Sequence, residues 1–195
     1  MTRFSSNDLE IDDLLKEPKN KKIKSGLKGK SAERDLVKIL NIRFAKIIAE
    51  HPKGGAFSRS VGSGSRWGQR VVLSESASQI YAGDLTCPEC FNFVIESKKG
   101  YNDIDLITAF TGKCGDLDEF LKQVKTDAER VKRKPLLIWK KDRKPALVFL
   151  KAAPGEIQIK LINEGVNPVF MTYLEWHVFR LDDLLKLPDE FWFKF

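Results

Sequence analysis

The hydrophobic and polar positions of this chain change period several times, and each period predicts a different element. Over residues 31–50 the apolar side chains recur at helical spacing, with Ser31 placed to cap the helix. The apolar positions there are Leu36, Val37, Leu40, Phe44, Ile47 and Ile48. A second helical stripe consists of Leu117, Phe120, Leu121, Val124 and Val131. Two amphipathic helices are therefore expected.

Strand patterns occupy much of the remaining chain. The segments QIYAGDL and FNFVIESKK predict a hairpin over residues 79–100, with TCPEC as its turn. PLLIWK and PALVFLK predict a second strand pair around KDRK. From EIQIKLIN through PVFMTYLEWHVFRLDDLLKL, one or two more strands and a short closing helix are expected. This order predicts a single α/β domain with a central mixed β-sheet flanked by helices.

Composition divides the chain into an arm and a body. Residues 1–30 are predicted to be a basic N-terminal arm or linker, because their Lys/Gly-rich part is too poor in apolar residues to fold alone. Residues 31–195 are predicted to form the folded domain, with about 151–195 as a C-terminal extension. Trp139 alternates with apolar neighbours and is expected in the core. The apolar end EFWFKF is expected to pack on the body or on a second subunit.

Composition also narrows the class of protein. No run approaches the roughly 20 apolar residues of a membrane span, and the first residues lack the order of a signal peptide. With three cysteines, an odd number, an intracellular, cytoplasmic address is expected, with no membrane contact and no organic cofactor. A net charge of +7 and a sequence pI near 9.2 favour polyanionic partners. The charge is clustered in KEPKNKKIKSGLKGK, and again from KQVKTDAERVKRK into KKDRK. Solvated helix faces and a basic tail explain these clusters as well as DNA binding does.

Within YAGDLTCPECFNFVIESKKGY, an acidic and basic set suits phosphate chemistry. Strand side chains alternate, so Glu96 and Lys98 share a face opposite Phe93 and Ile95, and the preceding strand can bring Asp84 beside them. Two converging carboxylates repel unless a cation separates them, and their hard oxygens suit Mg²⁺ or Mn²⁺. The nearby lysine could orient the attacking water and stabilise charge on a phosphodiester. A surface cross-strand salt bridge is the alternative interpretation.

Three further features favour the chemical interpretation. Glu33 lies on the core-facing stripe at the start of the first helix, although a glutamate there can simply complement the helix dipole. The Gly/Ser loop RSVGSGSRWGQ carries Arg59 and Arg66 and could bind phosphates, or could be a plain connection. The second helix contains Gln123 and Lys125, which would extend a positive surface beside the site.

Taken in this order, the motifs resemble those of PD-(D/E)xK nucleases, and more narrowly of archaeal-type and phage-encoded Holliday junction resolvases, over about residues 28–150. The resemblance implies a restriction-endonuclease-like fold with metal ligation by Asp84 and Glu96, and by Glu33 directly or through water. It implies Lys98 as the catalytic lysine. A serine near the scissile phosphate is also implied, and Ser63 and Ser65 are its candidates. Gly83 departs from the family pattern, since it stands where the superfamily name has proline.

The expected partner is DNA, branched or duplex, with contacts from the Gly/Ser loop, the end of the predicted strand and the second helix. The residues are Arg59, Arg66, Trp67, Lys99, Gln123 and Lys125. Trp67 could stack on an unpaired base or anchor its loop. Cutting a four-way junction symmetrically requires two related active sites, so a homodimer is expected, in the host cytoplasm if the chain is phage-encoded. Alternatives are a restriction-type or homing-type endonuclease and a non-catalytic basic DNA-binding protein.

The cysteine pair Cys87-Pro-Glu-Cys90 has the spacing of half a structural zinc site. Two more ligands would be needed from Cys114, His51 and His177, and none of these is paired at zinc-knuckle spacing. A structural zinc at Cys87 and Cys90 is therefore not expected unless Cys114 folds back over them. No chemistry is assigned to the two histidines.

Overall fold

The computed structural model describes residues 25–60, 82–111 and 114–194. The helices are α2 (Ser25–Arg43), α3 (Ala45–Glu50), α5 (Asp116–Arg130), α6 (Pro154–Asn163), α7 (Leu181–Leu184) and α8 (Asp189–Trp192). Two 3₁₀ turns accompany them, η1 (Pro52–Gly54) and η3 (Leu106–Thr111). The strands are β1 (Ser58–Arg59), β2 (Leu85–Thr86), β3 (Phe93–Lys99), β4 (Lys134–Lys140), β5 (Ala146–Leu150), β6 (Phe170–Tyr173) and β7 (Trp176–Arg180).

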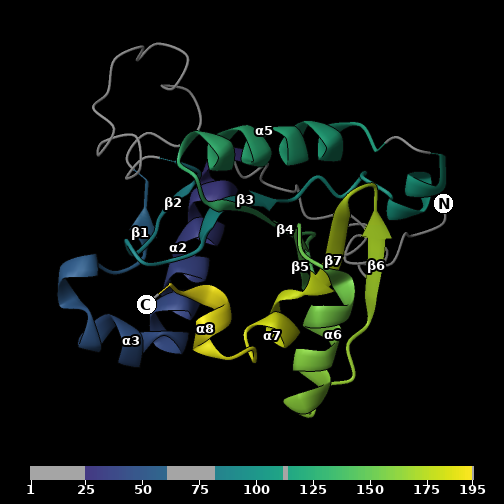
Figure 1. The fold of residues 1–195 in the computed structure, drawn as a ribbon. Coiled ribbons are helices and arrows are strands. Elements are labelled where there is room, and N and C mark those ends of the chain that lie inside the picture. The colour runs from purple at the N-terminus through teal and green to yellow at the C-terminus, as the bar shows by residue number, and fades with distance from the viewer. Residues whose placement is uncertain (1–24, 61–81, 112–113, 195) are drawn as a thin grey trace, which may run out of the picture.

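Five strands form the central sheet in the order β3-β4-β5-β7-β6 (Figure 1). β3 and β4 are parallel, and α5 is the crossover between them, while every other neighbouring pair in this sheet is antiparallel. The predicted pair around KDRK is confirmed, because Leu136 of β4 lies opposite Leu150 of β5. The mixed sheet with flanking helices confirms the predicted α/β fold class.

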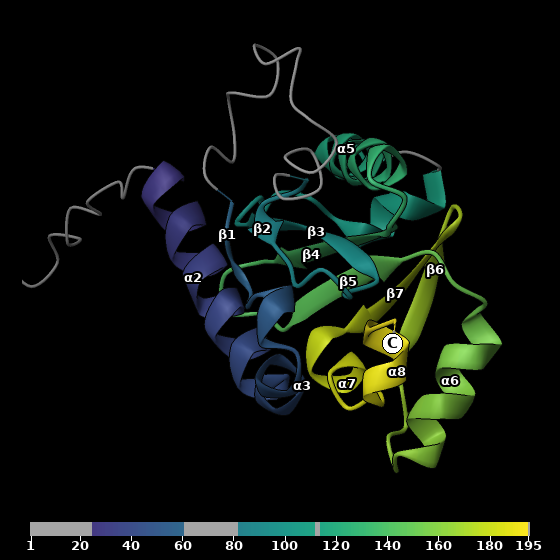
Figure 2. The same cartoon turned by 60° about the vertical axis from the view of Figure 1, so that its left-hand side comes forward.

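Helices cover both faces of the sheet (Figure 2). On one face, α5 buries the predicted stripe, including Leu117 and Val124, against Trp139 and other residues of β4, β5 and β7. On the opposite face, α2, α6, α7 and α8 enclose a larger core that contains Phe44, Phe93 and Trp192. Each helix therefore contributes one apolar face, as the helical spacing of the sequence requires.

The C-terminal aromatic residues close the larger core. Trp192 and Phe193 are buried beside Phe44, with ring centroids 5.7 and 5.0 Å from it. Arg43 at the end of α2 donates hydrogen bonds to the carbonyl oxygens of Leu185 and Leu187, and pairs with Asp189 at 2.8 Å. The expectation that this end packs on the body is confirmed for these aromatic residues.

Three local predictions are wrong. Helix α2 begins at Ser25, so Ser31 lies inside it and is not its N-cap. Residues 156–163, the segment EIQIKLIN, belong to helix α6, because Ile157 and Leu161 are buried one helical turn apart. The predicted hairpin over 79–100 does not form among the described residues, since β2 pairs with β1 in a separate small sheet.

Within 25–60, 82–111 and 114–194, none of the helices is both long and apolar enough to span a bilayer.

Candidate active site

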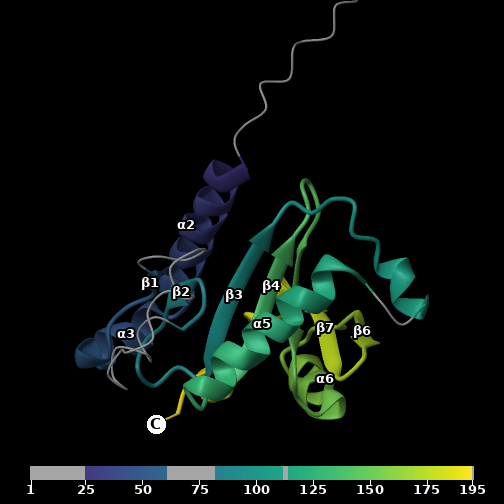
Figure 3. The same ribbon diagram turned by 90° about the horizontal axis from the view of Figure 1, so that it is seen from above.

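The alternation of β3 separates its apolar residues from its ionisable ones. Phe93 and Ile95 belong to the core beneath α2, whereas Lys98 lies on the α5 face with its Nζ 5.2 Å from the Phe120 ring centroid. Figure 3 shows α2 running alongside β3, and α5 crossing the other side. The prediction that Glu96 and Lys98 share a face is supported by the hydrogen bond from Lys98 Nζ to Glu96 Oε1 at 2.5 Å.

Asp84 reaches this strand by two hydrogen bonds in place of a continuous ladder. Its backbone N–H donates to the Ile95 carbonyl at 2.9 Å, and its Oδ2 accepts from the Ser97 backbone N–H at 2.9 Å. The same Oδ2 lies 4.0 Å from Lys98 Nζ. Asp84, Glu96 and Lys98 therefore form one cluster, which we call the acidic–lysine cluster. The predicted proximity is present, although the predicted hairpin is not.

Gly83 explains how Asp84 can lie so close to β3. Its φ of +77° belongs to a region that disfavours residues with a side chain, and an added Cβ would lie 2.5 Å from the Ile95 carbonyl oxygen. Proline, with φ fixed near −65°, could not adopt this conformation. The departure from the family proline is therefore part of the local geometry that places Asp84.

Replacing Gly83 by alanine is expected to lower the free energy of unfolding by about 3 kcal/mol or more, because backbone strain and a collision with β3 add together. The matched control is Gly100→Ala, where φ is +91° but nothing lies within 4 Å of an added Cβ. That control should lose only about 1 kcal/mol. Urea unfolding of both variants measures the difference, and equal losses would show that the approach of Gly83 to β3 is not tight.

Burial and charge perturb the acidic–lysine cluster strongly. Burial, followed by repulsion from Asp84, raises the pKa of Glu96 to about 8, and the neighbouring Lys98 offsets this only in part. Burial would lower the pKa of Lys98, but attraction to Glu96 and Asp84 outweighs it, so that this pKa is raised. The cluster thus holds a charged lysine against a carboxyl group that resists ionisation.

The donor set fits a hard divalent cation. Glu96 is 1% exposed, and no donor among the described residues reaches its Oε2. A buried oxygen without a partner is costly, and a cation lying against it and Asp84 would remove both that cost and the repulsion. Within the described ranges, no three Asp, Glu, His or Cys side chains come together as a metal-binding group. Two carboxylates completed by water and phosphate are the usual arrangement for Mg²⁺.

Glu33 lies on α2, outside the acidic–lysine cluster. It is buried on α2, and its Oε2 accepts from Arg59 Nε of β1 at 2.6 Å. Arg59 is in register with Leu85, the residue that follows Asp84. Ser60, which follows Arg59, donates its backbone N–H to the Asp84 carbonyl at 3.0 Å. The contact of Glu33 is therefore Arg59, and its part in metal binding stays a prediction.

The predicted DNA-binding residues lie in different surroundings. Lys99 is opposite Lys140 at the end of the parallel pair β3–β4. Gln123 is exposed on α5, whereas Lys125 pairs with Glu175 of the β6–β7 turn at 3.3 Å. The remaining candidates of the Gly/Ser loop lie outside the described residues: Ser63, Ser65, Arg66 and Trp67.

The sequence motifs did not point to Asp127, a neighbour of the acidic–lysine cluster. Burial raises the pKa of Asp127, Arg130 opposes this at 2.9 Å, and Asp84 raises the pKa further. Asp127 therefore lies within electrostatic reach of the cluster. It follows Val124 by three residues, so it borders the buried stripe of α5, and this spacing was the available signal.

The three cysteines are divided between the two faces of the sheet. Cys87 and Cys90 pack against the core beneath α2, whereas Cys114 is buried in the α5-side core with its Sγ 3.0 Å from Thr108 Oγ1. Burial raises the pKa of Cys87 to about 12, which favours the neutral thiol. The histidines are placed apart from these groups: His51 precedes η1, and His177 Nδ1 lies 3.1 Å from Thr172 Oγ1.

Comparison with known protein families agrees with this geometry. No curated protein and no solved structure matches the chain significantly. A family model described as phage putative PDDEXK endonuclease matches residues 24–186, which include every element from β1 to α7 and the whole acidic–lysine cluster. The chain therefore belongs to the family of phage PDDEXK endonucleases.

Proposed function

We propose that this chain is a divalent-metal-dependent DNA endonuclease that cuts phosphodiester bonds at the acidic–lysine cluster. The observation that carries the proposal is the burial of Glu96, with an unpartnered Oε2, beside Lys98, whose Nζ also lies 4.0 Å from Asp84 Oδ2. The Lys98 salt bridge satisfies one carboxylate oxygen, and a cation bound beside Asp84 would satisfy the other.

Each residue of the cluster has a distinct role in this proposal. Asp84 and Glu96 would hold Mg²⁺ or Mn²⁺, and a bound metal would lower the pKa of water and neutralise charge on the phosphate. Lys98 would orient the attacking water and stabilise the negative charge that develops on the phosphoryl oxygens. Glu33 would assist through water, since it pairs with Arg59 one element away. Ser63 or Ser65 would contact the scissile phosphate.

Branched DNA, such as a Holliday junction, is the proposed substrate, and a homodimer is the proposed assembly. The order of motifs resembles that of the resolvases, and the net charge of +7 suits a polyanion. Two cuts related by symmetry require two active sites related by a two-fold axis. The remaining proposed DNA contacts are Arg59, Arg66, Trp67, Lys99, Gln123 and Lys125.

A labelled four-way junction and a linear duplex of matched sequence test this proposal when each is incubated with the protein in Mg²⁺ or in EDTA. We expect cutting of the junction in Mg²⁺ alone, leaving 5′-phosphate ends, at a rate about tenfold or more above that of the duplex. This ratio corresponds to about 1.4 kcal/mol of discrimination. Equal cutting of both substrates would assign a general or sequence-specific endonuclease. Binding without cleavage in Mg²⁺ and in Mn²⁺ would leave a non-catalytic DNA-binding protein.

A further inference from the structure

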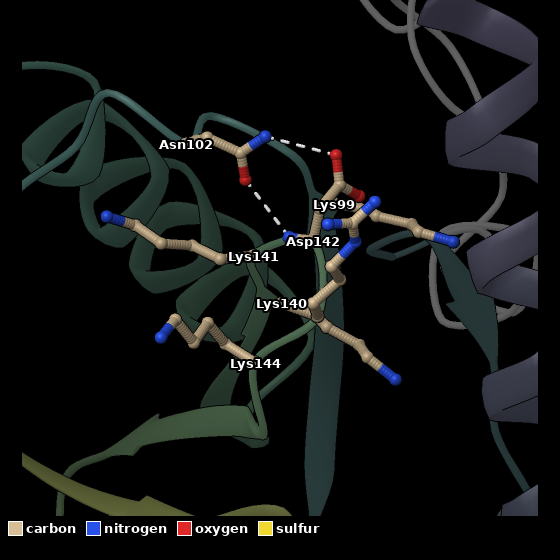
Figure 4. Close-up of a pocket in the computed structure, with 7 residues that line it drawn as sticks. Lys99, Asn102, Lys140, Lys141, Asp142 and Lys144 are labelled. Carbon is tan, nitrogen blue, oxygen red and sulfur yellow. Dashed lines mark hydrogen bonds between the residues drawn. The ribbon is translucent and has the colours of Figure 1, made fainter.

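We infer that the β4–β5 turn binds the DNA backbone a short distance from the scissile phosphate. This inference rests on the proposed function. The turn and its flanks contain four cations in five residues, Lys140, Lys141, Arg143 and Lys144, and Lys99 of β3 lies against them. We call the five cations Lys99, Lys140, Lys141, Arg143 and Lys144 the basic hairpin (Figure 4).

The basic hairpin is tied firmly to the segment that follows β3. Asn102 donates from Nδ2 to Asp142 Oδ2 at 3.0 Å, and its Oδ1 accepts from the Asp142 backbone N–H at 3.0 Å (Figure 4). Gly100 donates its backbone N–H to the Lys140 carbonyl at 3.0 Å, and Trp139 Nε1 donates to the Gly100 carbonyl at 3.2 Å. These bonds fix the backbone of the turn before any ligand arrives, so that DNA binding does not have to order this backbone.

The turn lies beyond the catalytic lysine along the strand direction. β3 and β4 are parallel, with Lys98 opposite Trp139 and Lys99 opposite Lys140, so both strands end at the same edge. Figure 3 shows the β4–β5 connection extending past the end of β3. At about 3.3 Å per strand residue, the turn is roughly 7–10 Å from the position of Lys98 along this direction. That distance corresponds to two or three nucleotides at about 3.4 Å each.

The cations of the basic hairpin have different tasks. Lys141 donates to the Ile104 carbonyl, and its Nζ lies 5.3 Å from the Trp139 ring centroid, so it helps to anchor the turn. Lys140, Arg143 and Lys144 are exposed. Lys99 and Lys140 point to the side on which α2 lies, and Lys144 to the other (Figure 4), so the charge surrounds the edge of the sheet. These exposed cations, with Lys99, are the proposed phosphate contacts.

The backbone of the turn is left-handed at Arg143. Arg143 has a φ of +58°, in the left-handed region where glycine or asparagine is the usual residue. A glycine would relieve the strain but remove a cation. Asp142, the acidic residue of the turn, accepts from Asn102, which keeps it in the anchoring contact. Several like charges crowded on a fixed turn repel one another, and a row of phosphates would relieve that repulsion.

The test uses a triple variant, Lys140→Ala with Arg143→Gly and Lys144→Ala, in the full chain. The matched control removes the same charge elsewhere, with Lys160→Ala, Lys186→Ala and Lys194→Ala, all exposed in the structure. Binding of a labelled duplex and of a four-way junction is measured by fluorescence anisotropy in EDTA, over a series of salt concentrations. Cleavage is therefore not needed for the measurement.

We expect the hairpin variant to bind DNA at least tenfold more weakly at low salt than the control. Its plot of log affinity against log salt should be shallower by about 2–3, since each lost phosphate contact removes about 0.9. Arg143→Gly alone should weaken binding while its melting temperature is unchanged or higher. Equal affinity and equal slope in the two triple variants would overturn the inference. If the wild-type protein binds DNA through the hairpin but never cuts it, the proposed function fails and only the DNA contact of the hairpin stands, without a scissile phosphate beside it.

Discussion

Replacing Glu96 by glutamine is expected to abolish DNA cleavage while DNA binding persists. The glutamine can still accept from Lys98 through its carbonyl oxygen, so the contact at 2.5 Å has a neutral counterpart. It cannot supply an anionic oxygen to a cation beside Asp84. We expect the single-turnover cleavage rate on a four-way junction to fall about 10³-fold or more.

The matched control for this change is Asp183→Asn, which neutralises another buried carboxylate on α7, away from the acidic–lysine cluster. Mn²⁺ binding, followed by the electron paramagnetic resonance signal of the free ion, supplies a measurement that does not depend on activity. Glu96→Gln should lose Mn²⁺ affinity, and Asp183→Asn should retain it. Cleavage by Glu96→Gln within tenfold of the wild type would exclude Glu96 as a ligand of an essential metal.

Glu96→Gln is also expected to change how the free energy of unfolding depends on pH. In the metal-free protein Glu96 keeps its proton up to about pH 8, whereas in the unfolded chain it ionises near 4.5. As pH rises through this window, the unfolded state loses a proton that the folded state retains, so the free energy of unfolding falls. The contribution is on the order of 3–5 kcal/mol. Urea unfolding in EDTA at pH 5 and pH 8 should show this loss in the wild type, and a much smaller one in Glu96→Gln.

Replacing Lys98 by methionine is expected to reduce cleavage by about 10²–10⁴-fold and also to destabilise the protein. Methionine preserves most of the side-chain volume against Phe120, where Lys98 Nζ lies 5.2 Å from the ring centroid. It removes the charge that offsets the repulsion between Glu96 and Asp84. We expect a loss of about 2 kcal/mol in the free energy of unfolding near pH 9, above the Glu96 pKa of about 8, since the ionised carboxylate is then left without its cation.

A double variant separates these two effects. Adding Glu96→Gln to Lys98→Met removes the carboxylate that is uncompensated near pH 9, so stability at that pH should recover while cleavage stays absent. Lys99→Met is the control for stability, because its side chain occupies the next strand position and lacks the Glu96 contact. Urea unfolding gives the stabilities. A double variant no more stable than Lys98→Met would show that the lysine acts through packing rather than charge.

Local periodicity was enough to predict the elements that build most of the sheet and one of its covering helices. The α5 stripe of Leu117, Phe120 and Val124 has helical spacing and a single buried face, so its pattern has one interpretation. The segments that became β4 and β5 are short, apolar and separated by a polar turn, which specifies an antiparallel pair. The acidic–lysine cluster followed from alternation in β3 together with the order of motifs.

Tertiary contacts decided what periodicity left ambiguous. Residues 156–163 alternate like a strand, yet Pro154 at the start of α6 and the burial of Ile157 and Leu161 favour a helix against the sheet. Asp84 approaches β3 through its side chain and one backbone bond, a geometry that strand patterns do not encode. The pairing of Glu33 with Arg59 joins α2 to β1, and its partner could not be chosen from spacing alone.

The alternation along β3 also separates residues that pack the core from residues of the acidic–lysine cluster. Phe93 and Ile95 lie in the core beneath α2, whereas Glu96 and Lys98 belong to the acidic–lysine cluster. Replacing Phe93 or Ile95 by another apolar residue changes the packing of the larger core and leaves the ionisable groups in place. Under the proposed function, exchange of Glu96 or Lys98 would alter the chemistry. Core packing and the proposed chemistry are therefore assigned to opposite faces of one strand, so that exchanges which adjust thermal stability need not alter the proposed active site.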